Sequence, residues 1–282
     1  MLTNKIAIVT DSTSDLPKDV AKEYGIRVVP LRIVYTNEEY KDRVEITPES
    51  IYARLDEEIP TSTLPLSEDM LAVFDELKAE GYEHVIMLPL SSNLSGTYNL
   101  AQLLAKDYEG MQIHVVESAT LSLGLGFMAI EAAKAAKETG SVEETIAHVN
   151  AVRKNMTGLF VLKTLKYLKL GGRIGKVSAT LGTMLHLKPI IWVNDEGIYE
   201  TLTKARGRGR SIESLVDKIK TKYRGKCINL AIVHGDAYQE AVKVYEKVAQ
   251  FAHVKLKFIE QVSPVIGLHT GPGLLGVIAY EA

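Results

Sequence analysis

The first half of the chain repeats one pattern three times: an apolar strand, a loop rich in serine and threonine, and a helix. The three loops lie in "VTDSTSD" (9–15), "LPLSSNLSGT" (88–97) and "VVESATLSLG" (115–124). Repeated strand–helix units predict a parallel sheet with helices on both faces. Loops that follow parallel strands share one edge of the sheet, where ligands commonly bind. We therefore expect the three hydroxyl clusters to converge on one crevice.

The second half of the chain follows a different pattern. After a helix over 141–155, "LFVL" indicates a strand, a helix is expected near 178–187, and "PIIWVNDEGIYETLT" (189–203) predicts a hairpin. Helices and strands then alternate up to the last strand, "GVIAY" (276–280). We predict an α/β protein with an N-terminal parallel-sheet domain over 1–157 and a smaller C-terminal α+β domain over 158–282, with the ligand between them.

Local signals place further elements. "IRVVPLRIVY" (26–35) indicates one strand, with Pro30 at an edge or a bulge. Ser67 is expected to be the N-cap of the helix that follows it. A helix over 121–140 is expected to end at Gly140. It is apolar nearly all round in its first half, so it is buried or forms the wall of an apolar cavity.

Composition and charge exclude several classes of protein. The net charge of −2 over 282 residues gives no reason to expect nucleic-acid or membrane-surface binding. No apolar run approaches the ~18 residues of a membrane span, and "MLTNKIAIVTDS" does not resemble a signal peptide, so we expect a cytoplasmic protein. Cys227 is the only cysteine, which excludes an intrachain disulfide and a multi-cysteine zinc site. The apolar run "CINLAIV" predicts that Cys227 is a buried strand residue. We expect neither a metal nor a cofactor.

The hydroxyl clusters suit a particular anion. Serine, threonine and backbone N–H groups at a helix N-terminus form an anion site. Phosphate sites normally add lysine, arginine or a Walker loop, and none of the three clusters contains a cation. Neutral hydroxyls therefore favour a single carboxylate. The alternative interpretation is that each serine only caps its own helix.

Two other motifs give weaker signals. "GLGFMA" (124–129) matches a dinucleotide fingerprint, but residues 117–123 separate it from the strand, so its glycines more simply allow a helix or a ligand to approach closely. "KARGRGR" (204–210) is either a solvated loop or a docking patch for an acidic partner or a phosphate. RNA binding is not favoured, because no aromatic residue lies among the arginines.

Histidine and arginine supply further candidates. His269 is expected in a rigid loop over the glycine-rich "GLHTGPG" (267–273), and it is either structural or a hydrogen-bond donor to a ligand. Arg173, in "GGRIGK", either caps a helix or meets the ligand. Ser95, His269 and Asp11 could in principle form a catalytic triad, so a serine-dependent esterase or acyltransferase is the alternative function. However, the chain has no G-x-S-x-G nucleophile elbow.

Seven stretches in order along the chain carry a family resemblance: "IVTDSTSDLP", "PTSTLP", "LSSNLSGTYNLA", "ESATLSLGLGFMAIEAAKAAKETG", "YLKLGGRIGK", "LGTMLHLKPII" and "VIGLHTGPGLLGV". Together they resemble the DegV family of bacterial fatty-acid-binding proteins, the FakB-type binding subunits of fatty acid kinase. The resemblance covers residues 8–277. It implies a two-domain α/β protein that holds one long-chain fatty acid in an apolar tunnel between its domains.

The resemblance also implies the site residues. The carboxylate would meet Ser62 or Thr63 of "PTSTLP", together with Ser95 and His269. This loop departs from the family's P-T-T-S-Q-P pattern, since Leu64 replaces glutamine and the hydroxyl order is swapped, so the choice between Ser62 and Thr63 stays open. Residues that would support the site or face the partner are Arg173, Ser12, Ser92 and Ser118.

The same resemblance implies a partner. A separate ATP-dependent kinase subunit would phosphorylate the bound fatty acid, and the acyl phosphate would feed phospholipid synthesis. The binding subunit itself would be no enzyme and would carry no cofactor besides its fatty acid ligand.

Overall fold

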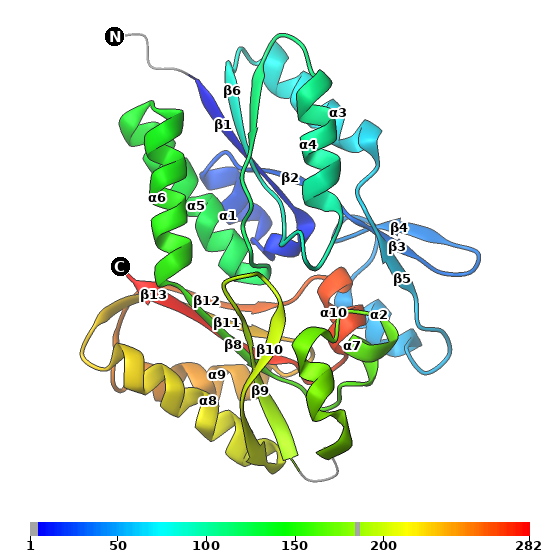
Figure 1. Ribbon diagram of the computed structural model, residues 1–282, viewed down its shortest axis with the longest axis vertical. Helices are drawn as coiled ribbons and strands as arrows, with labels where there is room; N and C mark the ends of the chain where they lie inside the picture. The colour runs from blue at the N-terminus through cyan, green and yellow to red at the C-terminus, as the bar shows by residue number, and fades with distance from the viewer. Residues whose placement is uncertain (1–4, 184–186) are drawn as a thin grey trace. The chain divides into compact units, whose positions relative to one another are not determined.

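The computed structural model describes residues 5–183 and 187–282 (Figure 1). The chain divides into two compact units. The first unit contains the residues up to Ile46 and Ser62–Lys154, and the second contains Thr47–Thr61 and Asn155–Ala282.

The first unit is built on a four-stranded sheet in the order β2-β1-β6-β7. Its strands are β1 (Ile6–Asp11), β2 (Arg27–Val29), β6 (His84–Leu88) and β7 (Gln112–Val115). All neighbouring pairs are parallel. This confirms the parallel sheet that the repeated strand–helix pattern predicts.

Helices cover both faces of this sheet (Figure 1). On one face lie α3 (Ser67–Ala79) and α4 (Thr97–Asp107), where Met70, Phe74 and Leu77 pack against the buried side chains of β1 and β6. On the other face lie α1 (Lys18–Glu23) and α5 (Ser122–Thr139), and α6 (Val142–Asn155) follows α5 in the chain.

The apolar start of α5 is buried, as one of the two sequence interpretations expects. Every residue from Ser122 to Ile130 is buried. Gly126 has a packing role, because a Cβ atom there would lie 2.7 Å from the backbone oxygen of Ser14 in the short 3-10 helix η1 (Ser12–Ser14). Gly126 thus allows a close approach between α5 and η1, and both glycines of "GLGFMA" lie within α5 and not at a strand–helix turn.

A small second sheet in the first unit was not foreseen from the sequence. Its order is β4-β3-β5, with β3 (Arg32–Val34), β4 (Glu39–Lys41) and β5 (Thr61–Thr63). The single strand expected over 26–35 is wrong, because the chain breaks at Pro30 and its halves, β2 and β3, join different sheets. The N-cap of α3 is Leu66 and not Ser67, and no side chain caps that end.

The second unit contains a six-stranded mixed sheet in the order β10-β9-β8-β13-β11-β12. Only β11 and β12 pair in parallel, and the other neighbours are antiparallel. The strands are β8 (Thr157–Val161), β9 (Leu187–Val193), β10 (Tyr199–Arg206), β11 (Cys227–His234), β12 (His253–Gln261) and β13 (Leu275–Glu281).

Two groups of helices complete the second unit. The long helices α8 (Gly207–Tyr223) and α9 (Tyr238–Ala249) bury Leu215, Ile219 and Val244 against the sheet. Three short helices form a second group, in which α2 (Pro48–Arg54) and α7 (Lys166–Leu170) both pack against α10 (Pro264–Thr270) (Figure 1). The helix expected over 178–187 is instead a 3-10 stretch, η2 (Gly175–Thr183), followed by β9, and residues 184–186 lie outside the described residues.

Residues 47–61 belong to the second unit although residues of the first unit flank them in the sequence, and the two units are of nearly equal length. Helix α2 packs closely against this unit through Tyr52. A Cβ atom on Gly235 would lie 2.6 Å from the Tyr52 hydroxyl oxygen, and a Cβ atom on Gly267 would lie 2.9 Å from it. These glycines let α2 sit close to α10 and the end of β11.

Two further observations concern single features. Cys227 is exposed, which contradicts the expectation of a buried strand residue, because it is the first residue of β11 and only the following residues enter the core. Among the helices within the described ranges, none combines the length and the apolar character that crossing a bilayer requires.

Candidate functional site

The loops that follow β1, β6 and β7 are joined by hydrogen bonds at one edge of the first unit's sheet. The Leu90 N–H donates to Asp11 Oδ2 at 2.7 Å, and the Ser91 N–H donates to the Thr120 carbonyl at 2.8 Å. The parallel order β1-β6-β7 is the reason, since it places the carboxyl ends of all three strands together.

Asp11 performs a structural task in this network. It is fully buried, and its Oδ1 accepts from the N–H of Thr13 at 2.9 Å and from the Thr13 hydroxyl at 2.5 Å. Burial raises the pKa of Asp11 to about 6, although the hydrogen bonds from Thr13 and Leu90 oppose the rise. Both carboxylate oxygens thus hold loop backbone, which does not favour Asp11 as the third member of a catalytic triad.

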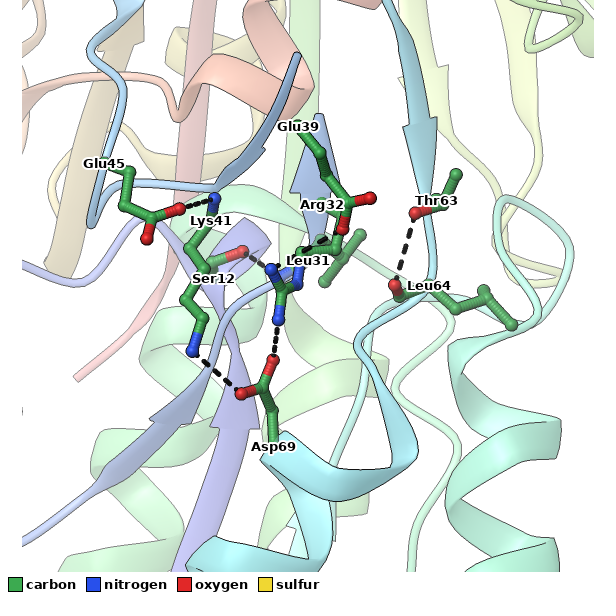
Figure 2. Close-up of polar contacts among 9 residues, drawn as sticks. All are labelled: Ser12, Leu31, Arg32, Glu39, Lys41, Glu45, Thr63, Leu64 and Asp69. Atoms are coloured by element: carbon green, nitrogen blue, oxygen red, sulfur yellow. Dashed lines mark hydrogen bonds and ion pairs between the residues drawn. The ribbon is translucent and has the colours of Figure 1, made fainter. Parts of the chain in front are cut away.

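Several serines of the three clusters make hydrogen bonds to backbone or side chains of the first unit. The Ser12 Oγ accepts from the Leu31 N–H at 3.1 Å (Figure 2). The Ser118 Oγ donates to the Thr120 carbonyl and accepts from the Thr120 N–H. Ser92 is half-buried, and its N–H donates to the carboxylate of Glu117. The Ser118 hydroxyl thus serves its own loop, whereas the Ser12 hydroxyl holds backbone that is 19 residues away in the chain, and neither serine is a helix N-cap.

Ser95 lies at the N-terminus of α4 and is half-buried. Its Oγ lies 3.0 Å from the hydroxyl of Thr97 and accepts from the Thr97 N–H. Next to it, Gly96 lies beneath Leu64, whose two terminal carbons would be 3.5 and 3.6 Å from a Cβ atom on that glycine. The structure thus brings together, within the first unit, the "PTSTLP" and "LSGT" loops that the sequence proposes for carboxylate binding.

The three hydroxyl residues of β5 alternate in exposure. Thr61 and Thr63 are exposed and Ser62 is half-buried, so Ser62 points to the opposite face of the strand from the two threonines. The Thr63 hydroxyl lies 3.5 Å from the Leu64 carbonyl (Figure 2). Ser62 and Thr63 therefore cannot face one ligand together without a change in this strand.

A hollow of about 490 Å³ lies in the second unit. Two predicted residues, Arg173 and His269, line it together. His269 does not lie in a loop as expected, because α10 extends through Thr270 and places His269 in its last turn. The other lining residues are Ile59, Pro60, Thr61, Leu170, Gly171, Gly172 and Leu268.

Burial and charge determine the state of His269. The side chain is 9% exposed, and burial, assisted by the positive charge of Arg173, lowers the pKa of its imidazole to about 3. His269 is therefore neutral at physiological pH and can donate one hydrogen bond. Arg173 donates through Nη1 to the Gly171 carbonyl at 2.6 Å, which keeps its charge near the α7 C-terminus.

Thr61 is a candidate that the sequence did not reveal. It lines the hollow with His269, whereas the family resemblance implies Ser62 or Thr63 from the same run. The signal was present, because "PTST" contains three consecutive hydroxyl residues. Because the three residues are consecutive, the sequence could not show which of them would face the hollow.

The basic run 204–210 is part of regular structure and is not a loop. It spans the end of β10 and the first turn of α8, and Arg208 forms an ion pair with Glu240, with Nε 2.9 Å from Oε1. Within the part of the chain that the structure describes, no group of three or more histidine, cysteine, aspartate or glutamate side chains could hold a metal ion.

Comparisons with known proteins cover the whole chain. The family model described as "Uncharacterised protein, DegV family" matches residues 5–282. A DegV domain-containing protein of Clostridium acetobutylicum is 40% identical over 98% of this chain and 99% of its own. Protein DegV of Bacillus subtilis is 30% identical over 96% of this chain and 98% of its own.

Solved structures agree with this assignment. A DegV family protein of Thermus thermophilus, described by its fatty acid binding, superposes with a TM-score of 0.92 at 35% identity, covering 99% of this chain and 100% of the other. A stearic-acid-binding protein of Eubacterium ventriosum gives a TM-score of 0.87 at 25% identity, covering 99% and 98%. The fold, its parallel and mixed sheets and the full-length matches together show that this chain belongs to the DegV family.

Proposed function

We propose that this protein binds a long-chain fatty acid and presents its carboxylate to a separate, ATP-dependent fatty acid kinase. The observation that carries the proposal is the hollow in which a neutral His269 lies beside Arg173 and Thr61. In this proposal the protein performs no chemical step itself and needs no cofactor.

The chemistry of these groups suits a carboxylate. Burying a carboxylate costs several kcal/mol unless hydrogen bonds satisfy it. A neutral imidazole and neutral hydroxyls, such as those of His269, Thr61 and Ser95, donate one hydrogen bond each. Single donors leave lone pairs on the carboxylate free for attack on a phosphorus atom, whereas a bidentate arginine would occupy them.

The acyl chain would supply most of the affinity. Each buried methylene contributes about 0.8 kcal/mol, so on the order of fourteen contribute roughly 10 kcal/mol before the costs of association are subtracted. The fatty acid and stearic acid binding of the Thermus thermophilus and Eubacterium ventriosum relatives supports this ligand class.

The kinase step rests on the family resemblance. A carboxylate held by neutral donors is a competent acceptor for a phosphoryl group, and the resulting acyl phosphate would enter phospholipid synthesis in the cytoplasm. Incubation of the loaded protein with a purified fatty acid kinase and ATP tests this part directly, since acyl phosphate should form only when both proteins are present.

Substitution of Ser95 tests the binding site. A hydrogen bond to a charged group contributes about 1.5–3 kcal/mol, so Ser95→Ala should weaken oleate binding by roughly 10- to 100-fold. Ser67→Ala is the matched control, because Ser67 is exposed and is not the N-cap of α3. Calorimetric titration of delipidated protein measures both, and full affinity in Ser95→Ala would remove Ser95 from the site.

The fatty acid itself can be sought in the purified protein. Mass spectrometry of the extracted lipid should find a bound long-chain acid. A protein that carries none and takes up none when it is added would contradict the proposal. Turnover of a p-nitrophenyl ester that Ser95→Ala abolishes would favour the esterase instead.

A further inference from the structure

A partly buried ion-pair cluster lies next to the hydroxyl strand in the first unit (Figure 2). Asp69 accepts hydrogen bonds from Arg32 through Oδ2 and from Lys41 through Oδ1, the latter at 2.9 Å. The side chains of Arg32 and Asp69 are only 10% and 19% exposed. Pairs this buried are screened less by salt than surface pairs, and breaking one is costly.

The cluster joins the small sheet to the main body of the first unit. Arg32 belongs to β3 and Lys41 to β4, whereas Asp69 lies in the first turn of α3. Helix α3 is itself fixed, because Phe74 and Leu77 are buried against the parallel sheet. Asp69 is thus the fixed point to which β3 and β4 are attached.

Strand β5 depends on β3 for its place. It has three residues, and β3 is its neighbour in the small sheet. A strand this short is not stable alone. In the connection from β5 to α3, Leu64 and Leu66 are 37% and 42% exposed and only Pro65 between them is buried. The position of β5 therefore depends on two things: Arg32 holds its neighbour β3, and the chain after β5 enters α3, where Asp69 lies.

Further contacts confine the same strand. Ser12 accepts from the Leu31 N–H, one residue before Arg32, and so attaches the start of β3 to the end of β1. Leu64, directly after β5, lies over Gly96 beside Ser95. These two contacts limit how far β5 can shift relative to the loops after β1 and β6. Asp69 adds one bond to β3 and one bond to β4, the two other strands of the small sheet.

We propose that Asp69, through its bonds to Arg32 and Lys41, is a positioning residue that holds β5 in register with the Ser95 loop, so that one face of the strand, carrying either Ser62 or Thr63, meets the carboxylate. This inference rests on the proposed function. Asp69 touches no ligand itself; it acts through β3. Loss of its charge should loosen β5 while the parallel sheet stays folded.

The test compares Asp69→Asn with Glu68→Gln, which removes an exposed carboxylate from the same turn of α3. Oleate affinity should fall about 10-fold in Asp69→Asn, because misplacement of about 1 Å has effects of this size or larger, and it should not change in Glu68→Gln. Hydrogen exchange of the β5 amides in the ligand-free protein should accelerate in Asp69→Asn alone. Unchanged oleate affinity or unchanged β5 exchange would overturn the inference.

A double-mutant cycle separates positioning from a general loss of stability. In a Ser62→Ala/Thr63→Val background, Asp69→Asn should weaken binding by about 3-fold at most, because the groups it positions are gone. An undiminished effect there would assign Asp69 a merely structural role. If Asp69→Asn does not fold, Lys41→Met removes one of the two bonds and should give a smaller loss in the same direction. A wild-type protein that binds no fatty acid would overturn the proposed function, whereas a wild type that binds and an Asp69→Asn variant that binds equally well would overturn only this inference.

Discussion

Gly171→Ala tests the packing that holds His269 in the hollow of the second unit. A Cβ atom on Gly171 would lie 2.1 Å from His269 Nδ1 and 2.8 Å from its Cε1. Ordinary contacts between such atoms are about 3.5–4.0 Å, so the imidazole or helix α7 has to move by more than about 1 Å. Because His269 borders the hollow, the displaced ring is expected to leave its position on the wall of that hollow.

The expected magnitudes follow from this overlap. Overpacking of a filled site costs about 1–3 kcal/mol of unfolding free energy, and each kcal/mol lowers the Tm of a domain this size by roughly 2–4 °C. Fatty acid affinity should fall at least about 10-fold, because a hydrogen bond to a carboxylate contributes about 1.5–3 kcal/mol.

Gly172→Ala is the matched control. Gly172 has a φ of +72° and nothing within 4 Å of its Cβ position, whereas Gly171 has helical backbone angles. Alanine at 172 should therefore cost about 1–2 kcal/mol in backbone strain without moving His269. Thermal unfolding and calorimetric titration with oleate measure both variants. The reasoning is refuted if Gly171→Ala binds oleate as tightly as the wild type, or if both variants lose affinity equally.

Two further predictions concern buried titratable groups. The pKa of His269 is about 3 in the folded protein, against 6.5 for an unperturbed histidine, so the stability that the neutral imidazole contributes is present above pH 6.5 and is lost as the pH falls toward 3. By pH 5 the loss is roughly 2 kcal/mol, and urea unfolding at pH 7 and pH 5 should show a shallower pH dependence in His269→Gln than in the wild type. Equal slopes would contradict the neutral, buried imidazole. Asp11→Ala should cost about 2–5 kcal/mol, because it leaves the buried N–H groups of Thr13 and Leu90 without an acceptor, whereas Asp11→Asn keeps one acceptor and should cost less. The pKa of Asp11 is raised to about 6, so the pH dependence of its contribution to stability is opposite to that of His269. The stability contributed by protonated Asp11 is lost as the pH rises from 3.8 to 6. Equal Tm values for the Ala and Asn variants would contradict the role of Asp11.

Much of the fold was predictable because its signals are local. Apolar runs separated by hydroxyl loops predicted the parallel sheet, and Gly140 predicted the end of α5, where it adopts a φ of +62°. The turn at residues 195–197 predicted the hairpin of β9 and β10. In each case neighbouring residues alone decide the backbone conformation.

Other elements were missed because distant residues decide them. The glycines and the proline of "GLHTGPG" suggested a loop around His269, yet residues 264–270 form the helix α10, which Ser263 caps and which packs against α2 and α7. Strands β3 and β5 are three residues long, too short for any periodic pattern. Their pairing brings residues 32–34 beside residues 61–63, and no local window contains both segments.

The sequence by itself determined the types of side chain available for a site: hydroxyls in three loops, His269, Arg173 and no metal-binding cysteine pair. Only the tertiary structure decided how these groups are used. It assigned Ser12 and Asp11 to loop backbone, placed Thr61 in the hollow with His269, and lowered the pKa of that histidine. The physical reason is that burial and hydrogen-bond partners arise from residues far apart in the chain, so the chemistry of a side chain is fixed only after the chain has packed around it.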